Sequence, residues 1–229
     1  MTSSSLTKSA LQDIIQWDIE NWSRCLPFWE KHIDHSQPKK VLALGEREGG
    51  ISLYFALNGH DVICSDYNPL PESTVHLHQK YKVADRVSYQ ALDMKAINLL
   101  DESVDIVVFK SVLGALSNTE DQEKALKEIH RVLKKDGIFL FAENLEGSKL
   151  HKYLRNKFVK WGKRWRYIKT REMLDWGDAF ADKKTETHGV VGLFGRSENQ
   201  RRKFAGLDRF LTPITPQNWR YILFGAMKK

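Results

Sequence analysis

Short apolar segments that alternate with helical segments constrain the fold of this 229-residue chain more than any other feature. Five segments of four to six residues have the length and the apolar character of buried strands, and helical patterns separate most of them. Strands that alternate with helices form βαβ units, in which the strands are parallel and lie in one sheet. The five segments are residues 41–44, 61–65, 87–91, 104–109 and 138–142.

The other segments complete an α/β pattern. We expect helices at residues 10–33, 51–58, 70–83 and 121–133, with Pro27 ending or kinking the first of them. Residues 185–194 and 219–227 are expected to be late strands. Pro213 and Pro216 lie between them, which suggests an antiparallel hairpin that closes the sheet.

Composition excludes several classes of protein. Apolar residues make up 41% and charged residues 28%, so the chain can bury a core and is not a disordered tail. No window approaches the ~20 apolar residues of a membrane span, and the first residues lack the apolar region of a secretory signal. Cys25 and Cys64 are too few for a disulfide framework or a structural zinc site. We therefore expect a reduced, cytoplasmic setting.

Positive charge is concentrated in one segment. Residues 147–173 hold ten basic residues and one acid, so this segment carries +9, and the rest of the chain carries −2 of the total of +7. Gly162 divides its helical pattern, which predicts two short helices. The segment suits an anionic substrate, an acidic membrane surface or nucleic acid, and a solvated helix docked on the core is the alternative. Its apolar residues at helical spacing are Leu150, Leu154, Phe158, Trp161 and Trp165.

A glycine-rich turn follows the first expected strand, with the sequence Gly-Glu-Arg-Glu-Gly-Gly at residues 45–50. Such a turn before a helix lets backbone N–H groups approach a ligand closely. Asp66 ends the next strand, 21 residues after Gly45, where a carboxylate can accept hydrogen bonds from ribose hydroxyls. The dinucleotide fingerprint requires glycine where Arg47 stands, and no phosphate-loop Gly-Lys-Ser/Thr follows. A plain tight turn is the alternative interpretation.

Two later phrases resemble the class I S-adenosylmethionine-dependent methyltransferases. They are DIVVFKSVL at residues 105–113 and EIHRVLKKDGIFLF at residues 128–141, and the resemblance spans residues 39–144. It implies a Rossmann-like three-layer sandwich with a seven-stranded, mostly parallel sheet and an antiparallel closing strand. It also implies a methyltransferase with S-adenosyl-L-methionine as its cofactor.

The same resemblance assigns roles to residues at the ends of the early strands. The glycine-rich turn would line the methionine end of the cofactor, Asp66 would hold the ribose, and Lys110 would lie under the sulfonium centre. This chain departs from the family at Ala43, where an acid is usual, and at Arg47, which replaces a glycine. The implied cofactor-binding residues are Gly45, Glu46, Arg47, Gly49, Asp66, Asp93, Met94 and Lys110.

A narrower resemblance concerns the amino-terminal segment. The Arg-x-Gly-Gly form of the turn, with Gln16-Trp-Asp18 and Asn21-Trp22, is similar to small methyltransferases of bacterial surface-polysaccharide pathways. It implies a helical lid at residues 1–38 and an S-adenosylmethionine-binding domain at residues 39–229, with a basic helical insertion at residues 147–173. Ordinary core packing is the alternative for the tryptophans.

Methyl transfer to an alcohol also requires removal of a proton. The candidate bases are His188, Glu143 and Lys110, which lie on a late strand or at strand tips. The histidines show no metal-ligand spacing. Asp93, Glu143 and Asn144 could supply oxygen ligands, but no pair of acids follows the fourth strand, so we expect no metal site.

The basic insertion is expected to bind the acceptor. Arginine and lysine favour phosphate and carboxylate groups, and tryptophan faces can stack on sugar rings. An anionic saccharide or a lipid-linked glycan of surface-polysaccharide biosynthesis fits, and the protein could then lie on the inner face of an acidic membrane. RNA or another polyanion is the alternative acceptor; a non-catalytic scaffold and a nicotinamide-dependent reductase are further alternatives. The expected acceptor residues are Lys160, Trp161, Lys163, Arg164 and Trp165.

Overall fold

A seven-stranded sheet forms the centre of the computed structural model, which describes residues 3–158 and 165–229. The strand order is β3-β2-β1-β4-β5-β7-β6, and the first five strands are parallel to one another. β7 is antiparallel to both β5 and β6. This arrangement confirms the predicted fold class. The strands are β1 (Lys40–Leu44), β2 (Asp61–Asp66), β3 (Val87–Ala91), β4 (Val104–Lys110), β5 (Leu133–Asn144), β6 (Asp182–His188) and β7 (Ile222–Lys228).

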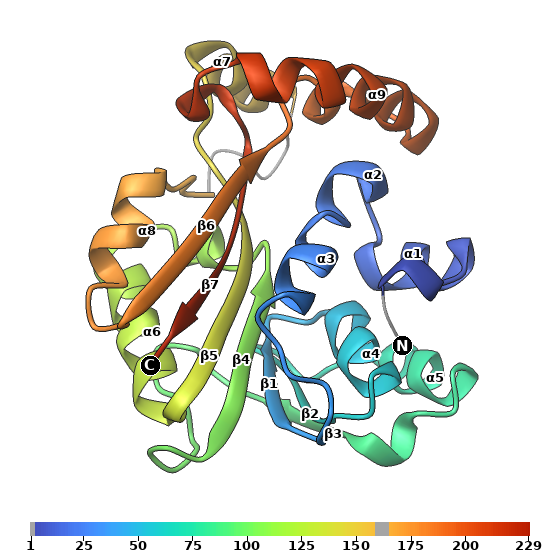
Figure 1. Ribbon diagram of the computed structural model, residues 1–229, viewed down its shortest axis with the longest axis vertical. Coiled ribbons are helices and arrows are strands. Elements are labelled where there is room, and N and C mark those ends of the chain that lie inside the picture. Colours follow the sequence, from blue (N-terminus) through green and yellow to red (C-terminus); the bar gives the residue numbers. More distant parts are fainter. Residues whose placement is uncertain (1–2, 159–164) are drawn as a thin grey trace.

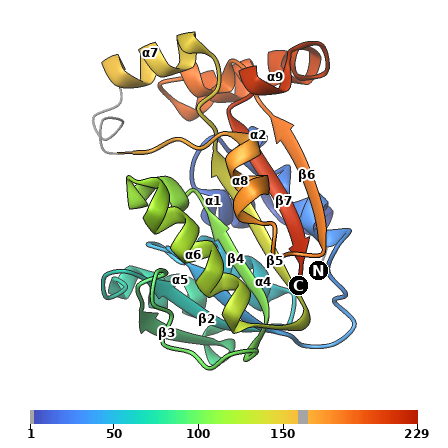
Figure 2. The same cartoon turned by 90° about the vertical axis from the view of Figure 1, so that its left-hand side faces the viewer.

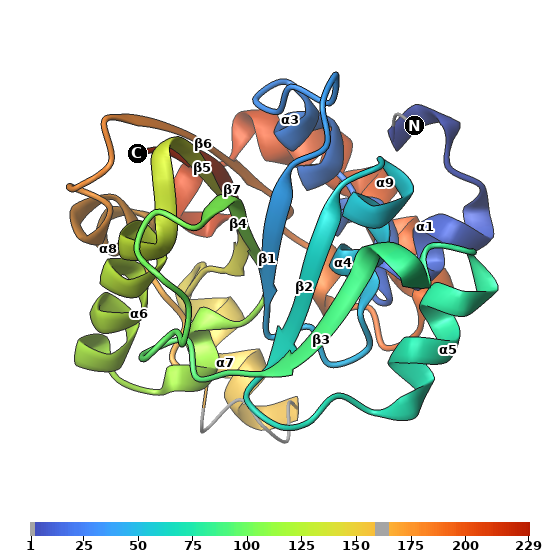
Figure 3. The same cartoon turned by 90° about the horizontal axis from the view of Figure 1, so that it is seen from below.

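Helices cover both faces of the sheet, which gives three layers (Figure 1; Figure 3 shows the same layers from below). One layer contains α1 (Lys8–Ile15), α2 (Ile19–Trp22), α3 (Cys25–Glu30), α4 (Gly50–Leu57) and α5 (Glu72–Lys80). The other contains α6 (Thr119–Val132) and α8 (Thr170–Trp176). α7 (Lys149–Phe158) and α9 (Glu198–Ile214) lie together at one end of the molecule in two perpendicular views (Figures 1 and 2). Short 3-10 helices occur at Ser3–Ser5, Ala84–Arg86, Leu113–Leu116, Gly192–Phe194 and Gln217–Trp219.

The core is divided by the sheet because successive strand residues point to opposite faces. In β1, Val41 and Ala43 pack in the cluster beneath α1 to α4, whereas Leu42 and Leu44 pack in the cluster beneath α6 and α8. All four side chains are buried. Such doubly buried strands read as continuous apolar runs, which is why they could be located from the sequence.

α6 shows why its segment folds as predicted. The Asn118 side chain caps the helix by accepting the backbone N–H of Asp121 at 2.8 Å. Its buried side chains recur at helical spacing and pack on the sheet. None of the helices in the described ranges combines the length and apolar character that a bilayer-spanning helix needs.

The amino-terminal segment differs from the single helix expected at residues 10–33, because it is broken into α1, α2 and α3. Gln16 and Asp18 have positive φ angles of 72° and 45°, which interrupt a right-handed helix. The backbone N–H groups of Asp18 and Ile19 instead donate to the Glu198 carboxylate, at 3.1 and 2.8 Å. The break therefore depends on a contact with α9, at the other end of the sequence.

The two late strands pair antiparallel, as predicted, but a helix rather than a simple hairpin loop connects them. The strand expected at residues 185–194 ends at His188, where Gly189 turns the chain with a φ of 76°. The 17-residue helix α9 then precedes β7. α9 has no apolar stripe that faces the core, because its buried residues are Ala205, Asp208 and Thr212. No helix is predicted here from the sequence, although Leu207, Phe210 and Ile214 recur at helical spacing.

A buried polar cluster joins these late elements to the amino-terminal helices. The Asp208 carboxylate has no exposed surface and accepts the backbone N–H groups of Val190, Val191 and Gly192 at 2.7–2.9 Å. The Asn21 side chain donates to Asp18 at 3.1 Å and to the Tyr221 hydroxyl at 2.9 Å. The Tyr221 hydroxyl in turn donates to the Asp18 carboxyl, and burial raises the pKa of that carboxyl to about 6.

A pair of glycine substitutions tests this cluster. A Cβ atom at Gly192 would lie 2.1 Å from Asn21 Nδ2 and 2.9 Å from Asp208 Oδ2, so Gly192→Ala must displace the cluster. We expect it to lower the free energy of unfolding by about 2–4 kcal/mol, measured by urea denaturation.

Gly206→Ala is the matched control. Gly206 lies in the exposed interior of α9, where a Cβ atom would have nothing within 4 Å, so alanine should stabilise the helix by ~0.5–1 kcal/mol. Equal effects of the two substitutions would show that the cluster does not hold α9 in place.

Candidate active site

The carboxyl ends of the parallel strands open into a cavity of about 1750 Å³. The strand order reverses between β1 and β4, and open α/β sheets bind ligands at such a switch point. The volume exceeds the usual range of a single small-molecule site, which is roughly 300–1000 Å³. It leaves room for a nucleoside-sized ligand and a second molecule. The wall includes Trp17, the turn after β1, Asp66, Asp93, Met94, Lys110, Ser111, Asn144, Arg155, Trp165, Tyr167, Arg196 and Arg201.

The backbone of the glycine-rich turn packs closely against Val112, in the loop after β4. Gly45 has a φ of 65°, and a Cβ atom there would lie 2.5 Å from the Val112 side chain. Arg47 also has a positive φ, 42°, in a region that favours glycine. Its backbone is held at both ends, because its N–H donates to Asp66 Oδ2 at 3.1 Å and its carbonyl accepts the Thr74 hydroxyl at 2.9 Å. These contacts allow arginine where the family has glycine.

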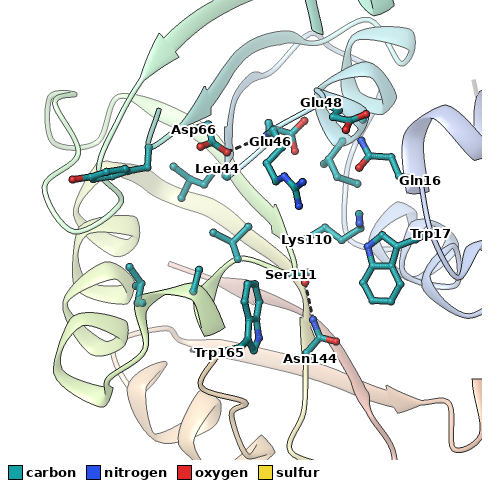
Figure 4. A pocket seen from close by; sticks show the side chains of 18 of the residues that line it. Gln16, Trp17, Leu44, Glu46, Glu48, Asp66, Lys110, Ser111, Asn144 and Trp165 are labelled. Carbon is teal, nitrogen blue, oxygen red and sulfur yellow. Dashed lines mark hydrogen bonds between the residues drawn. The ribbon is translucent and has the colours of Figure 1, made fainter. Parts of the chain in front are cut away.

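Carboxylates line the part of the cavity formed by the early turns. Glu46, Asp66 and Asp93 all line the wall, as the sequence predicts, and Met94 lies beside Asp93. Glu46 is 6% exposed and accepts the Ser52 backbone N–H at 2.7 Å; burial raises the pKa of its carboxyl to about 7. Asp66 remains partly exposed at the end of β2 (Figure 4). Gly49 differs from the other predicted residues, because it precedes α4 and does not line the cavity.

Lys110 lies at the tip of β4 and lines the cavity beside Trp17 (Figure 4). Its ammonium nitrogen is 5.5 Å from the Trp17 ring centroid and 5.3 Å from that of Trp22. Burial lowers the pKa of this amine. Next to it, Asn144 at the end of β5 donates to the Ser111 hydroxyl at 2.6 Å. Ser111 and Asn144 therefore line the wall as an ordered pair; from the sequence, Asn144 is considered only as a metal ligand and Ser111 is not considered.

Glu143 does not line the cavity, contrary to the prediction that it is a candidate base. Its carboxylate is fully buried, where Oε2 accepts the N–H groups of Val112 and Leu113 at 2.9 and 2.7 Å. Oε1 accepts the N–H of Asn144 at 2.7 Å. Burial raises the pKa of this carboxyl. Glu143 thus positions the loop after β4 from behind.

His188 is also absent from the cavity wall, which argues against its predicted role as the base. It is 5% exposed, and its Nε2 lies 3.1 Å from the Asn21 side-chain oxygen in the buried polar cluster. Burial lowers the pKa of this imidazole to about 3. Among the three predicted bases, Lys110 alone lines the cavity. The difference arises because the chain turns at Gly189, which leaves His188 behind the cavity wall.

Trp165, one of the expected acceptor residues, lines the cavity. It packs directly on Gly114, where a Cβ atom would lie 1.9 Å from the indole nitrogen, and the Arg166 N–H donates to the Gly114 carbonyl at 2.9 Å. This contact needs glycine and holds the indole over the loop after β4. The other four expected acceptor residues, Lys160, Trp161, Lys163 and Arg164, lie outside the described residues.

Arg155 supplies a cation that the sequence analysis did not assign to the site. It is 2% exposed, and its guanidinium donates to the Leu145 and Glu146 carbonyls and stacks 4.0 Å from the Tyr167 ring centroid. Burial lowers the pKa of this guanidinium to about 10. In the part of the chain that the structure describes, no carboxylate forms an ion pair with it.

Other charges of the basic segment are partly neutralised within the protein. Arg166 pairs with Glu172, Lys152 with Glu146 and Arg171 with Asp175. Only part of the +9 is thus available to an external partner. In residues 3–158 and 165–229, no cluster of three histidine, cysteine or acidic side chains could hold a metal ion.

Three comparisons relate the chain to known proteins. Residues 42–141 match the family model of a methyltransferase domain. A putative methyltransferase of Bacillus subtilis, YqeM, is 31% identical over 116 residues, which are 49% of this chain and 46% of that protein. Phosphoethanolamine N-methyltransferase 2 of Haemonchus contortus, in complex with phosphomonomethylethanolamine and S-adenosylhomocysteine, aligns with a TM-score of 0.65 at 17% identity, over 91% of this chain and 52% of its own. The YcgJ protein of Bacillus subtilis aligns with a TM-score of 0.60 at 19% identity, over 90% and 96% of the two chains.

The chain spans about half the length of the curated relative and of the Haemonchus enzyme. The structural similarity therefore bears on the fold, whereas the family match bears on the central segment. Together they confirm the prediction of a methyltransferase domain of the type that uses S-adenosylmethionine. Residues 42–141 match a methyltransferase domain, and the sheet that contains them has the class I fold of S-adenosylmethionine-dependent methyltransferases.

Proposed function

We propose that the protein transfers a methyl group from S-adenosylmethionine to an oxygen of an anionic acceptor, namely an acidic or lipid-linked saccharide of surface-polysaccharide biosynthesis. One observation carries this proposal, which is the distribution of charge along the cavity wall. Glu46, Asp66 and Asp93 come from the turns after the early strands. Among the described wall residues after 144, by contrast, three are arginines and none is acidic.

The acidic part of the wall fits the cofactor. Asp66 keeps a partly exposed carboxylate at the end of β2, where it can accept hydrogen bonds from ribose hydroxyls. The turn at residues 45–47 lines the same part of the wall, and Gly45, which lacks a Cβ atom, lets it pack directly on Val112. Asp93 and Met94 line the adenine side in this proposal. When bound, the cofactor supplies the activated methyl group.

The basic part of the wall fits an anionic acceptor. Arg155, Arg196 and Arg201 line it, and arginine forks suit phosphate and carboxylate groups. The buried Arg155 guanidinium lacks an ion-pair partner in the described residues, and buried charges are usually paired. Trp17 and Trp165 offer flat faces for a sugar ring. The acceptor would therefore bring both an anionic group and a flat saccharide surface.

Lys110 is the proposed catalytic residue. It lies between the acidic and the basic parts of the wall, at the tip of β4. Burial lowers the pKa of its amine, and in the free-base form that amine can accept a proton from an acceptor hydroxyl. Ser111 and Asn144 lie beside it and can orient that hydroxyl by hydrogen bonding. The arrangement therefore supplies a base, an orienting pair and aromatic faces around one point.

Methyl transfer from labelled S-adenosylmethionine tests the proposal. We expect label in a lipid-linked or acidic glycan fraction and not in RNA. Lys110→Met should lower kcat by roughly 10²–10⁴-fold, the range for loss of a general base, while S-adenosylhomocysteine affinity stays within a few-fold. Lys135→Met, an exposed change on β5, is the matched control.

Other outcomes would reject specific parts of the proposal. Label in RNA alone would overturn the acceptor class. Binding of S-adenosylhomocysteine without transfer to any fraction would favour a non-catalytic scaffold. Binding of NADH with no heat from S-adenosylhomocysteine would favour a reductase and overturn the cofactor assignment.

Glu46 gives a pH-dependent prediction. Its pKa is about 7 without ligand, and a cation bound at the methionine end would lower it. The ligand would thus bind the ionised carboxylate more tightly, so affinity for S-adenosylmethionine should rise several-fold from pH 6 to pH 8, with release of a proton. Calorimetry in two buffers of different ionisation enthalpy measures that proton.

Glu46→Gln provides the control for this linkage. The variant has no carboxyl to titrate at residue 46, so its affinity should change little over the same range of pH. Wild-type affinity that is independent of pH, with no proton released, would show that Glu46 does not face the charged part of the cofactor.

A further inference from the structure

Large apolar side chains that face solvent are concentrated at one end of the molecule. In the described ranges, eight large hydrophobic residues are exposed, and six of them belong to α7, α9 and the 3-10 helix at Gln217–Trp219. α7 and α9 lie at the same end in two perpendicular views (Figures 1 and 2). The six residues are Leu150, Tyr153, Leu207, Phe210, Ile214 and Trp219.

α9 carries the strongest part of this feature, on a surface that we call the outer face. Leu207, Phe210 and Ile214 recur at spacings of three and four, so they lie on one side of the helix. They are 53%, 77% and 78% exposed. A surface helix normally turns such a stripe toward the core, but the core side of α9 holds Ala205, Asp208 and Thr212. The amphipathic pattern is thus inverted.

Charge on the outer face has one dominant sign. Arg202, Lys203 and Arg209 are exposed beside the apolar stripe. The two acids of α9 are held elsewhere, since Asp208 is fully buried and Glu198 accepts backbone N–H groups of the amino-terminal segment. Arg209 has an acidic neighbour, Glu20, at 3.7 Å, and their side chains are 64% and 42% exposed.

α7, beside α9, also exposes both apolar and basic side chains. Leu150 and Tyr153 are 56% and 59% exposed, and Lys149, Lys152 and Lys157 are exposed on the same short helix. Lys152 pairs with Glu146 at 2.7 Å. Both helices thus combine exposed apolar side chains with exposed lysine or arginine.

We propose that the outer face of α9, with α7 beside it, binds the surface of a membrane that contains anionic lipids. Apolar side chains on a basic helix enter the boundary between headgroups and acyl chains, while the cations bind acidic headgroups. A second copy of the chain fits less well, because it would bring cations against cations. The described helices do not span a bilayer, and this mode of binding does not require one to do so.

This inference extends the proposed function, because α7 and α9 also form the basic part of the cavity wall through Arg155 and Arg201. A lipid-bound α9 would place that wall close to a lipid-linked acceptor. The connection with the acceptor rests on the proposed function. Binding to lipid itself needs no methyl transfer, so the two proposals can fail separately.

Flotation of the full-length protein with vesicles tests the membrane contact. We expect the protein to float with phosphatidylcholine vesicles that contain about 30% phosphatidylglycerol and to remain behind with phosphatidylcholine alone. Binding should weaken as salt increases. Phe210→Ser/Ile214→Ser should lower the partition coefficient by roughly tenfold or more. Arg202→Glu/Lys203→Glu should abolish the preference for the anionic vesicles.

Matched controls use exposed residues away from the outer face. Leu100→Ser removes an apolar side chain that is 81% exposed and precedes β4. Lys124→Glu/Lys135→Glu reverses two exposed charges on α6 and β5. Neither should change flotation. Circular dichroism and S-adenosylhomocysteine calorimetry on every variant separate loss of lipid binding from loss of fold or of the cofactor site.

Three results would overturn the proposal. The first is absence of binding to anionic vesicles by a folded protein. The second is binding that Phe210→Ser/Ile214→Ser and Leu100→Ser reduce equally. The third is a dimer in sedimentation velocity that Phe210→Ser/Ile214→Ser dissociates while lipid binding is absent, since that would assign the outer face to a second copy.

Discussion

The Asp208 carboxylate is the interaction on which the late part of the structure depends. It is fully buried, and it accepts three consecutive backbone N–H groups from residues 190–192. A buried carboxylate is costly unless its oxygens are satisfied, so this bonding fixes both the rotation of α9 and the path of the loop. The residues that follow, 193–196, line the cavity. One polar contact thus sets one side of the cavity wall and also determines which side of α9 faces solvent.

The carboxyl ends of the parallel strands form the other side of the cavity. Each polar residue there is supported by a group behind it or beside it. Asp66 accepts the Arg47 N–H, and Glu143 holds the backbone of Val112 and Leu113. Catalytic and binding groups need supports of this kind to stay in place. Glu143 shows that a carboxylate at a strand tip can serve the site without touching a ligand.

The sequence predicts those parts of the fold and site that depend on local pattern. Asp66 and Lys110 each end a continuous apolar strand, so their place at the cavity follows from the strand itself. His188 and Glu143 could not be judged in this way, because their direction depends on the turn at Gly189 and on the loop after β4. α9 is missed because Pro213 and Pro216 suggest a hairpin connection, although Leu207, Phe210 and Ile214 recur at helical spacing; its small, polar core side cannot be inferred from that pattern. The cluster that holds it joins Asn21 to Asp208, which are 187 residues apart.

The net charge of a segment does not show which of its charged side chains face solvent. The +9 of residues 147–173 suggests an exposed basic surface, yet Arg155 is buried, and Arg166 and Lys152 pair with acids of the same region. α9 contributes Arg201 to the cavity and turns Arg202 and Lys203 to solvent. Adjacent positions on one helix therefore face two environments. Because the buried side of α9 is small and polar, Leu207, Phe210 and Ile214 lie on its exposed side, and an exposed apolar patch flanked by cations is the composition that suits an apolar and anionic partner.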